Sequence, residues 1–235
     1  MLGTRSASPG TRMDRVEDAL AALREGRPAI LVDDESRQHQ GDLTLPAQRP
    51  TTEQLAFAIR HSTGIICAPM AGQELDRLGI PMMTEHNTDP KRTAFTLSAD
   101  ARTGITAGVS AADRARTVRV LADPGSAPGD RVRPGHVFPL RAREGGILPR
   151  RGHSEAAGDR MRLSGNRPVG VRVEVINDDG TMARRHQLRE LADAHAMPMI
   201  SISDLERYRW LHEEPVEEVV SAPLPTAHGE FTAPA

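Results

Sequence analysis

Two side chains in this sequence are of types that transfer protons in enzymes, and both stand beside apolar runs. His136 follows a Pro-Gly pair in Arg133-Pro-Gly-His-Val-Phe-Pro-Leu140. An imidazole gains or loses a proton near neutrality because its unperturbed pKa is ~6.5. Glu174 interrupts the apolar stretch 169–176, where a carboxylate is costly unless it faces water or a polar site. The two are candidates for general acid and base, with a turn-capping histidine and a solvent-facing glutamate as the alternatives.

A second group of residues has the chemistry to bind phosphate. The segment Arg150-Arg-Gly-His-Ser-Glu155 places guanidinium, imidazole and hydroxyl groups at a predicted helix start. The first N–H groups of a helix are unpaired, and an arginine can bind phosphate oxygens through its fork of donors. Arg150, His153 and Ser154 are therefore candidate ligands. The alternative is an ordinary capped helix with exposed arginines.

A charged loop is the third candidate. Arg37 and Asp42 stand in it together with the acidic residues 33–35, directly after the apolar run 29–32. One cation and several anions can thus meet at a strand end, although most charged loops are simply solvated. No nucleophile elbow, phosphate-binding P-loop or Cys/His zinc cluster is present in the sequence, so those three chemistries have no support.

Helical and strand patterns alternate around these residues. Residues 13–25 present one apolar helical face, and residues 29–32 form the continuous apolar run of a strand buried on both faces. Thr51-x-x-Gln54 has capping-box spacing, and Ser110-x-x-Asp113 resembles a helix start. The other predicted elements are strands at 64–67, 94–97, 169–176 with one buried face, and near Met199, and helices at 184–196 and from Ser203. This alternation predicts an α/β fold.

Composition narrows the class of protein. A length of 235 residues suits one domain, which we place at 13–213 between a flexible segment 1–12 and a flexible Pro/Ala-rich tail 214–235. With 30 basic and 32 acidic residues, nucleic acid is not an expected partner. The apolar runs are far shorter than the ~20 residues that cross a bilayer, which predicts no membrane partner and a cytoplasmic location. The single cysteine, Cys67, is predicted to be a small buried hydrophobe.

The order and spacing of five motifs resemble 3,4-dihydroxy-2-butanone 4-phosphate synthase. The motifs are Val-Asp-Asp-Glu-Ser-Arg37 with Gly41-Asp42, Gly108-Val-Ser-Ala-Ala-Asp-Arg114, Arg133-Pro-Gly-His-Val-Phe-Pro-Leu140, Gly152-His-Ser-Glu155 and Asn177-Asp-Asp-Gly-Thr-Met-Ala183. The resemblance implies a single-domain α/β (α+β), three-layer sandwich-like fold and a homodimer with active sites shared between subunits. It also implies a lyase of riboflavin biosynthesis that converts ribulose 5-phosphate to the butanone phosphate and formate.

The resemblance also assigns residues. His136 and Glu174 match the family's two essential positions. The positions that match substrate contacts are Arg37, Asp42, Arg150 and His153, with Ser154 where the family has Thr. The family's magnesium is held by His153 and by a glutamate at position 38, which is Gln38 in this chain.

Several departures from the family pattern lie near that metal position. Gln40 also replaces a family glutamate, and Arg151 and the Lys91-Arg92 pair depart from the family pattern around the same expected pocket. A neutral amide oxygen lacks the charge that attracts Mg²⁺, so the sequence predicts no cofactor or a weakly bound Mg²⁺.

These observations predict a lyase or dehydratase that enolises and dehydrates ribulose 5-phosphate or a related sugar phosphate, with little formate release. An ordinary riboflavin-pathway synthase is the first alternative. A non-catalytic sugar-phosphate-binding homologue is the second, although retention of His136 and Glu174 argues against it.

Overall fold

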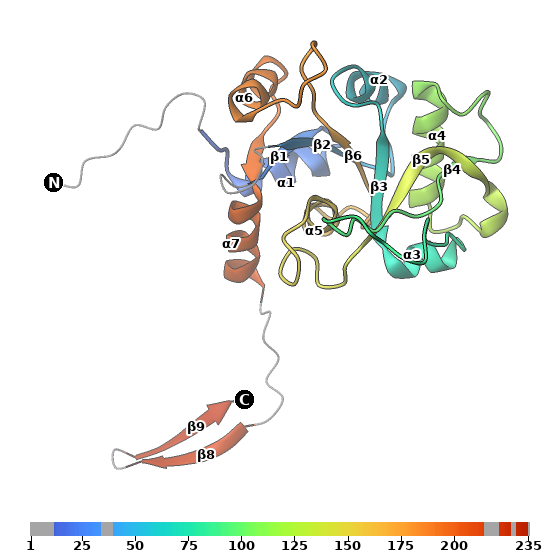
Figure 1. Ribbon diagram of the computed structural model, residues 1–235. Helices are drawn as coiled ribbons and strands as arrows, with labels where there is room; N and C mark the ends of the chain where they lie inside the picture. Colours follow the sequence, from blue (N-terminus) through green and yellow to red (C-terminus); the bar gives the residue numbers. More distant parts are fainter. Residues whose placement is uncertain (1–11, 34–39, 214–220, 227–228, 235) are drawn as a thin grey trace.

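A mixed seven-stranded sheet forms the centre of the protein. The computed structural model describes residues 12–33, 40–213, 221–226 and 229–234. The strands follow the order β4-β5-β3-β6-β2-β1-β7 across the sheet (Figure 1). Their bounds are β1 Ala29–Val32, β2 Gly41–Pro46, β3 Ile66–Ala71, β4 Ala99–Ala101, β5 Arg131–Ala142, β6 Gly170–Glu174 and β7 Met199–Ser201.

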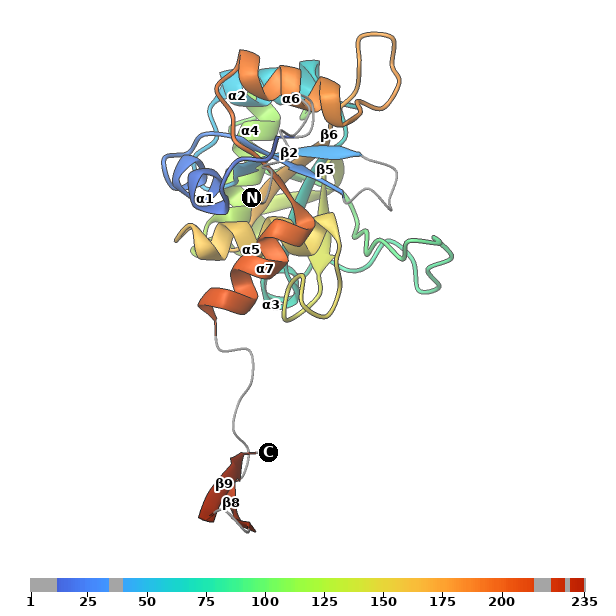
Figure 2. The same cartoon turned by 90° about the vertical axis from the view of Figure 1, so that its left-hand side faces the viewer.

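Helices cover both faces of this sheet. Figure 2 shows α2, α4 and α6 on one side of the sheet and α5 and α7 on the other, where α1 packs against α5 and α7. The bounds are α1 Val16–Arg24, α2 Thr52–Arg60, α3 Gly72–Arg77, α4 Ala111–Ala122, α5 His153–Leu163, α6 Arg185–Ala194 and α7 Ile202–His212. This is the predicted three-layer α/β architecture.

Strand β1 shows why two helical layers are needed. Ile30 and Val32 point into the core beneath α2, α4 and α6, whereas Ala29 and Leu31 point into the core beneath α1, α5 and α7. All four residues are buried, as the continuous apolar run predicts. Burying one face alone would leave half of these side chains in water.

Two helix starts are confirmed at the level of hydrogen bonds. Thr51 and Gln54 form a reciprocal capping box at the start of α2. The Ser110 hydroxyl accepts a hydrogen bond from Asp113 N at the start of α4. The apolar helix at 13–25 is confirmed as α1, and the helices predicted at 184–196 and from Ser203 are confirmed as α6 and α7.

Two strand predictions and one turn alternative need correction. The named strand near 94–97 is Ala99–Ala101, because Phe95 and Thr96 form only isolated bridges. The Pro-Gly pair before His136 lies within β5 and does not form a turn. Strand β6 is covered on both faces, since its second face packs beneath α5 and keeps Arg172 buried.

The C-terminal segment contains a hairpin that the sequence did not predict. Its strands are β8 Ser221–Thr226 and β9 Gly229–Pro234, paired antiparallel (Figure 1). Whether residues 214–235 are flexible stays a prediction. In the part of the chain that the structure describes, no helix is long and apolar enough to cross a membrane.

Candidate functional site

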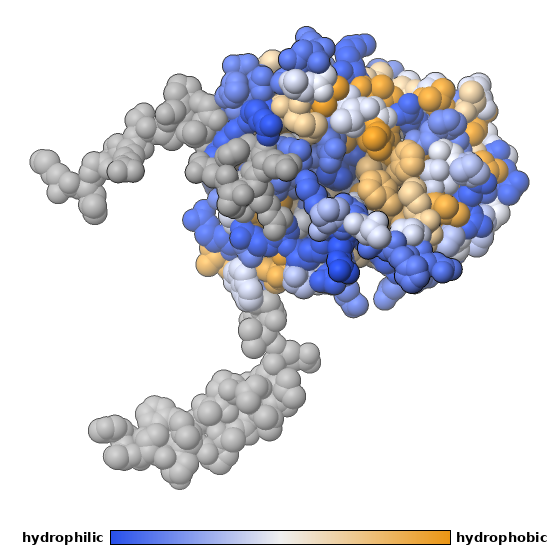
Figure 3. Space-filling view, viewed as in Figure 1, coloured by the Kyte–Doolittle hydropathy of each residue, from blue (hydrophilic) through white to orange (hydrophobic). Residues whose placement is uncertain are grey.

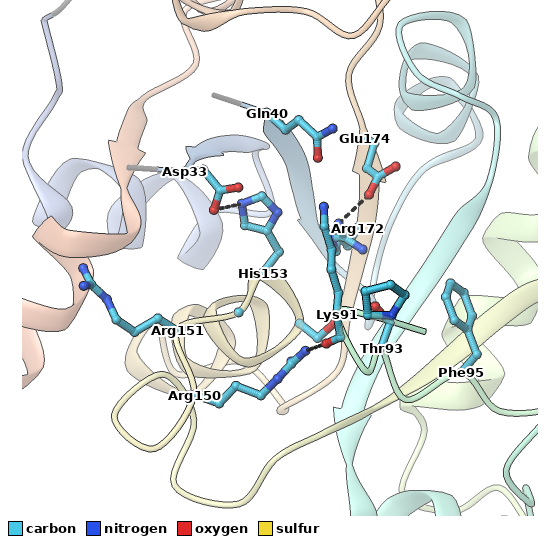
Figure 4. Close-up of a pocket in the computed structure, with 13 residues that line it drawn as sticks. Asp33, Gln40, Lys91, Thr93, Phe95, Arg150, Arg151, His153, Arg172 and Glu174 are labelled. Carbon is cyan, nitrogen blue, oxygen red and sulfur yellow. Dashed lines mark hydrogen bonds and ion pairs between the residues drawn. The ribbon is translucent and has the colours of Figure 1, made fainter. Parts of the chain in front are cut away.

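A pocket of about 550 Å³ opens where strand β2 begins and strand β6 ends, beside the start of helix α5. Figure 4 shows its walls, which come from four parts of the chain. The lining residues are Asp33, Gln40, Pro90, Lys91, Thr93, Phe95, Arg150, Arg151, Gly152, His153, Ser154, Arg172 and Glu174. The structure therefore brings Glu174 to the predicted phosphate-binding group Arg150, His153 and Ser154, which the sequence analysis selected separately from it.

Strand pairing explains how Glu174 reaches this pocket. Strands β2 and β6 are antiparallel, with Asp42 opposite Glu174 and Thr44 opposite Arg172. Alternate residues of a strand share a face, so Arg172 and Glu174 both point toward α5. The alternating apolar residues of the same strand, Val171 and Val173, fill the opposite core.

A buried charge network lies behind the pocket. The carboxylate of Asp42 is fully buried and accepts from the Arg172 guanidinium, and its Oδ2 lies 3.0 Å from His153 Nδ1. His153 Nε2 lies 3.2 Å from Asp33 Oδ1, a distance typical of an ion pair without the alignment of a hydrogen bond. Two carboxylates and two cations thus hold the start of α5 against the sheet.

The network shifts the pKa values of its members. Burial alone would raise the pKa of Asp42, but the charges of Arg172 and His153 hold it well below its usual range. Burial alone would lower the pKa of His153, but the charge of Asp42 and the neighbouring Asp33 raise it to about 9. At neutral pH, His153 is therefore an imidazolium and Asp42 a carboxylate.

Glu174 is the accessible carboxylate of the site. Its side chain is 42% exposed, and Oε1 accepts a hydrogen bond of 2.9 Å from Arg172. A carboxylate that is open to the pocket and held by a guanidinium can accept a proton from a bound molecule.

The candidate phosphate ligands cluster at the start of α5. Arg150 donates to Glu155 over 2.6 Å and to the carbonyl of Lys91 over 2.8 Å, so its guanidinium is already engaged. Ser154 is buried in the first helical turn and lines the pocket. The N-cap, Gly152, makes no side-chain cap, so the first amides of α5 are not satisfied by a capping side chain, and Gly152, His153 and Ser154 line the pocket.

His136 lies at the same edge of the sheet but is not among the described lining residues of this pocket. Its Nδ1 lies 2.7 Å from Asp100 Oδ2, and its backbone N–H donates to Asp100 Oδ1 over 2.9 Å. Strand β3 lies between β5, which carries His136, and β6, which ends at Glu174. Two strand spacings separate their Cα atoms by roughly 10 Å. A substrate can span the two residues, but they do not contact each other.

Part of the predicted metal loop falls outside the described residues. Arg37 and Gln38 belong to that part, whereas Gln40 lines the pocket. Within the described ranges, no group of three or more His, Cys, Asp or Glu side chains could hold a metal ion. Both ring nitrogens of His153 face carboxylates. The described residues thus do not by themselves fit a magnesium ion.

Two residues of the site were missed by sequence reasoning. Arg172, which bonds both Asp42 and Glu174, could have been found as a cation two positions before Glu174 on the same strand face. Asp100, which holds His136, had a weaker signal, an acidic residue inside the small-residue run Ser98-Ala-Asp-Ala101.

Cys67 has the predicted structural role. It is 5% exposed, and burial raises the pKa of its thiol to about 11. A thiol with such a pKa is protonated at neutral pH and unreactive.

Comparison with known proteins identifies the family. The family profile of 3,4-dihydroxy-2-butanone 4-phosphate synthase matches residues 17–208, which include every described site residue above. The chain belongs to the 3,4-dihydroxy-2-butanone 4-phosphate synthase family. The resemblance seen in the five sequence motifs is thereby confirmed.

Individual synthase-family relatives agree with this assignment. The riboflavin biosynthesis protein RibBA of Nocardia farcinica is 50% identical over 225 residues, covering 95% of this chain and 54% of that protein. RibBA of Salinispora arenicola is 49% identical over 223 residues, covering 95% and 53%. The chain therefore spans about half the length of the curated relatives it matches.

A solved synthase confirms the fold. The crystal structure of 3,4-dihydroxy-2-butanone 4-phosphate synthase in complex with two magnesium ions aligns with a TM-score of 0.83 and 38% identity. The alignment covers 87% of this chain and 100% of that chain. Members of this family thus include a magnesium-bound protein.

Proposed function

We propose that this protein converts ribulose 5-phosphate to 3,4-dihydroxy-2-butanone 4-phosphate and formate, as a lyase of riboflavin biosynthesis. The observation that carries the proposal is the family match over residues 17–208 together with Glu174 open to a pocket at the start of α5. Relatives at about half identity favour this ordinary synthase over the altered lyase that the sequence analysis put first.

Each pocket residue has a role in this proposal. Glu174 removes the proton beside the ketone, and His136, held by Asp100, exchanges a proton at the other end of the sugar. The amides at the start of α5 and the Ser154 hydroxyl bind the phosphate. Arg150 shapes this subsite through its bonds to Glu155 and the Lys91 carbonyl.

Of the substrate contacts that the family resemblance implies, the contact of Asp42 with the sugar has the least support from the structure. Asp42 is fully buried, is absent from the described pocket lining, and has Arg172 and His153 as partners. We assign it to the positioning of those two side chains. Contact of Arg37 with the substrate stays a prediction that lies outside the described residues.

A second candidate function is enolisation and dehydration without formate release. Gln40 favours it, because this neutral amide lines the pocket where the sequence pattern of the family has a glutamate. Magnesium binding is accordingly proposed to be weak or lost. A non-catalytic binding homologue is the third reading, and it is disfavoured by the retained Glu174 and Asp100–His136 pair.

We also propose a homodimer. Ile65 is 50% and Val109 is 49% exposed, and Arg114 ties the two segments together by donating to Gly64 O over 2.6 Å and to Val109 O over 2.8 Å. Figure 3, which has the same view as Figure 1, shows apolar surface gathered over the region where β3 and β5 lie. A partner subunit on the Ile65–Val109 patch would also border His136, because Gly108 packs against it. The predicted cytoplasmic location is kept as part of this proposal.

Isotope labelling tests the function directly. Ribulose 5-phosphate carrying ¹³C at C4 is incubated with the protein, and the products are followed by NMR. We expect stoichiometric labelled formate and a four-carbon phosphate, and we expect Glu174→Gln to abolish both. A labelled five-carbon dicarbonyl phosphate without formate would select the dehydratase, and no turnover would select the binding protein.

A further inference from the structure

The pocket holds four lysine or arginine side chains among its described lining residues, and they differ in whether a carboxylate already neutralises them. Three are paired with carboxylates of this chain: Arg150 with Glu155 at 2.6 Å, Arg151 with Glu206 at 3.1 Å, and Arg172 with Glu174 at 2.9 Å. The fourth is Lys91. No described residue forms a hydrogen bond or ion pair with its ammonium group, so its charge is available to a ligand.

The direction of the Lys91 side chain is a second reason to expect that its ammonium group contacts a ligand. Figure 4 shows it extending from its loop into the pocket, toward the end where Gln40 and Glu174 lie. The phosphate subsite proposed at the start of α5 lies at the other end of the side chain, near the Lys91 backbone. The free ammonium therefore faces the end of the pocket where proton removal by Glu174 takes place.

Hydrogen bonds fix the conformation of the loop that carries Lys91. Asp89 accepts hydrogen bonds from Lys91 N and Thr93 N, and Asn87 donates to Thr93 O over 2.9 Å. Arg150 holds the Lys91 carbonyl from the opposite wall. A fixed loop gives the side chain a defined origin, which lowers the entropy lost when it engages a ligand.

We propose that Lys91 is a further catalytic residue, which neutralises the oxyanion formed when the substrate is enolised. The proposal rests on the proposed function, because it takes Glu174 as the base. Glu174 accepts the proton from the carbon beside the ketone, the C–H electron pair becomes the C=C bond, and the C=O π pair moves onto oxygen. Lys91 donates an N–H hydrogen bond to that oxygen and keeps its own proton.

The charges around Glu174 explain why this cation matters. Gln40 is neutral, and the charge of Arg172 is shared between Asp42 and Glu174. An ammonium group that hydrogen-bonds a developing anion forms a charge-assisted bond, which is stronger than a bond between neutral groups. The Lys91 ammonium thus supplies a positive charge at the end of the pocket where Glu174 lies.

Enolisation is measured as exchange of the substrate's carbon-bound proton with solvent deuterium, alongside steady-state kcat and KM for ribulose 5-phosphate. We expect Lys91→Met to lower kcat by about 10²-fold, the usual loss when one donor to an oxyanion is removed, with KM little changed. Lys91→Arg should recover part of the loss, and added methylammonium should partly rescue Lys91→Ala.

Arg92→Met is the matched control. Arg92 is the adjacent cation of the same loop but is not among the described lining residues of this pocket, so its removal should leave kcat unchanged. Thermal unfolding of Lys91→Met should match that of the unmodified protein, because no described contact is lost.

The possible failures can be told apart. An active protein whose Lys91→Met variant keeps its kcat overturns the role of Lys91 alone. A rise in KM at constant kcat also overturns it, by showing that Lys91 contributes to substrate binding alone. An unmodified protein that neither exchanges the proton nor forms product overturns the proposed function and the role of Lys91 with it.

Discussion

Asp42 illustrates how one residue can support the site without touching the substrate. Replacing it by asparagine keeps the shape but leaves Arg172 and His153 buried without their shared carboxylate. Breaking a buried ion pair by removing one partner costs about 3–5 kcal/mol. We expect Asp42→Asn to lower the free energy of unfolding by about 3 kcal/mol, measured in urea. Asp76→Asn is the control, because Asp76 is exposed and its pair with Arg141 is worth about 1 kcal/mol at most. Equal losses in the two variants would contradict the network.

The same network predicts how stability depends on pH. The folded pKa of Asp42 lies below its usual 3.8, so its contribution is present above about pH 4 and is lost as pH falls. The folded pKa of His153 is raised from 6.5 to about 9, so its contribution is full below 6.5 and is lost as pH rises through 9. Stability from the network is therefore greatest between about pH 4 and 6.5. The urea midpoint of unfolding should be measured from below pH 4 to above pH 9, and it should vary more with pH in the unmodified protein than in Asp42→Asn. Parallel pH profiles of the two proteins would show that the network of Asp42 and His153 does not cause the pH dependence.

The prediction that activity depends only weakly on Mg²⁺ rests on Gln38 and Gln40. Carboxylate ligands attract Mg²⁺ by charge, whereas an amide oxygen does not. We expect activity that depends weakly on Mg²⁺, and we expect the double change Gln38→Glu and Gln40→Glu to raise Mg²⁺ affinity in calorimetry. Complete loss of activity in a chelator, with full recovery on Mg²⁺ alone, would contradict this prediction.

At the scale of elements, the contact of β4 with β5 positions His136 through Asp100. A Cβ on Gly135 would lie 2.1 Å from the Ala99 carbonyl carbon, so only glycine allows β4 to approach. Asp100, which holds His136, follows Ala99 directly. We expect Gly135→Ala to destabilise the fold by about 1–3 kcal/mol and to lower kcat, because Asp100 is displaced. Gly129→Ala is the control, since a Cβ there meets no atom within 4 Å. Similar unfolding midpoints for the two variants would show that β4 and β5 accommodate the added methyl group without loss of stability.

At the scale of the whole molecule, the Ile65–Val109 patch predicts association. Ile65→Glu places a charge on this apolar surface, and we expect it to convert a dimer to a monomer in light scattering, with loss of activity. Leu211→Glu is the control, because Leu211 is 73% exposed on α7, apart from the patch. A fully active monomeric unmodified protein would disprove the dimer.

Much of the architecture could be predicted from the sequence because its signals are local. The apolar run 29–32, the capping box at Thr51 and the cap at Ser110 each depend on neighbours within one turn or one strand. The five collinear motifs likewise point to the family through residue order and spacing alone. Residue types alone also marked Glu174, His136 and the segment around His153 as candidates.

Only the tertiary structure decided which of these residues meet. Asp42 and Arg172 are 130 positions apart, and the pairing of β2 with β6 joins them. The same pairing places Glu174 at the pocket while β3 separates it from His136. The folded structure also decides which charges are neutralised, because it brings Glu206 to Arg151 and orients the nearby Glu155 and Glu174 toward Arg150 and Arg172. Lys91 is therefore distinguished from the arginines around it by the fold, because the four side chains look equally cationic in the sequence.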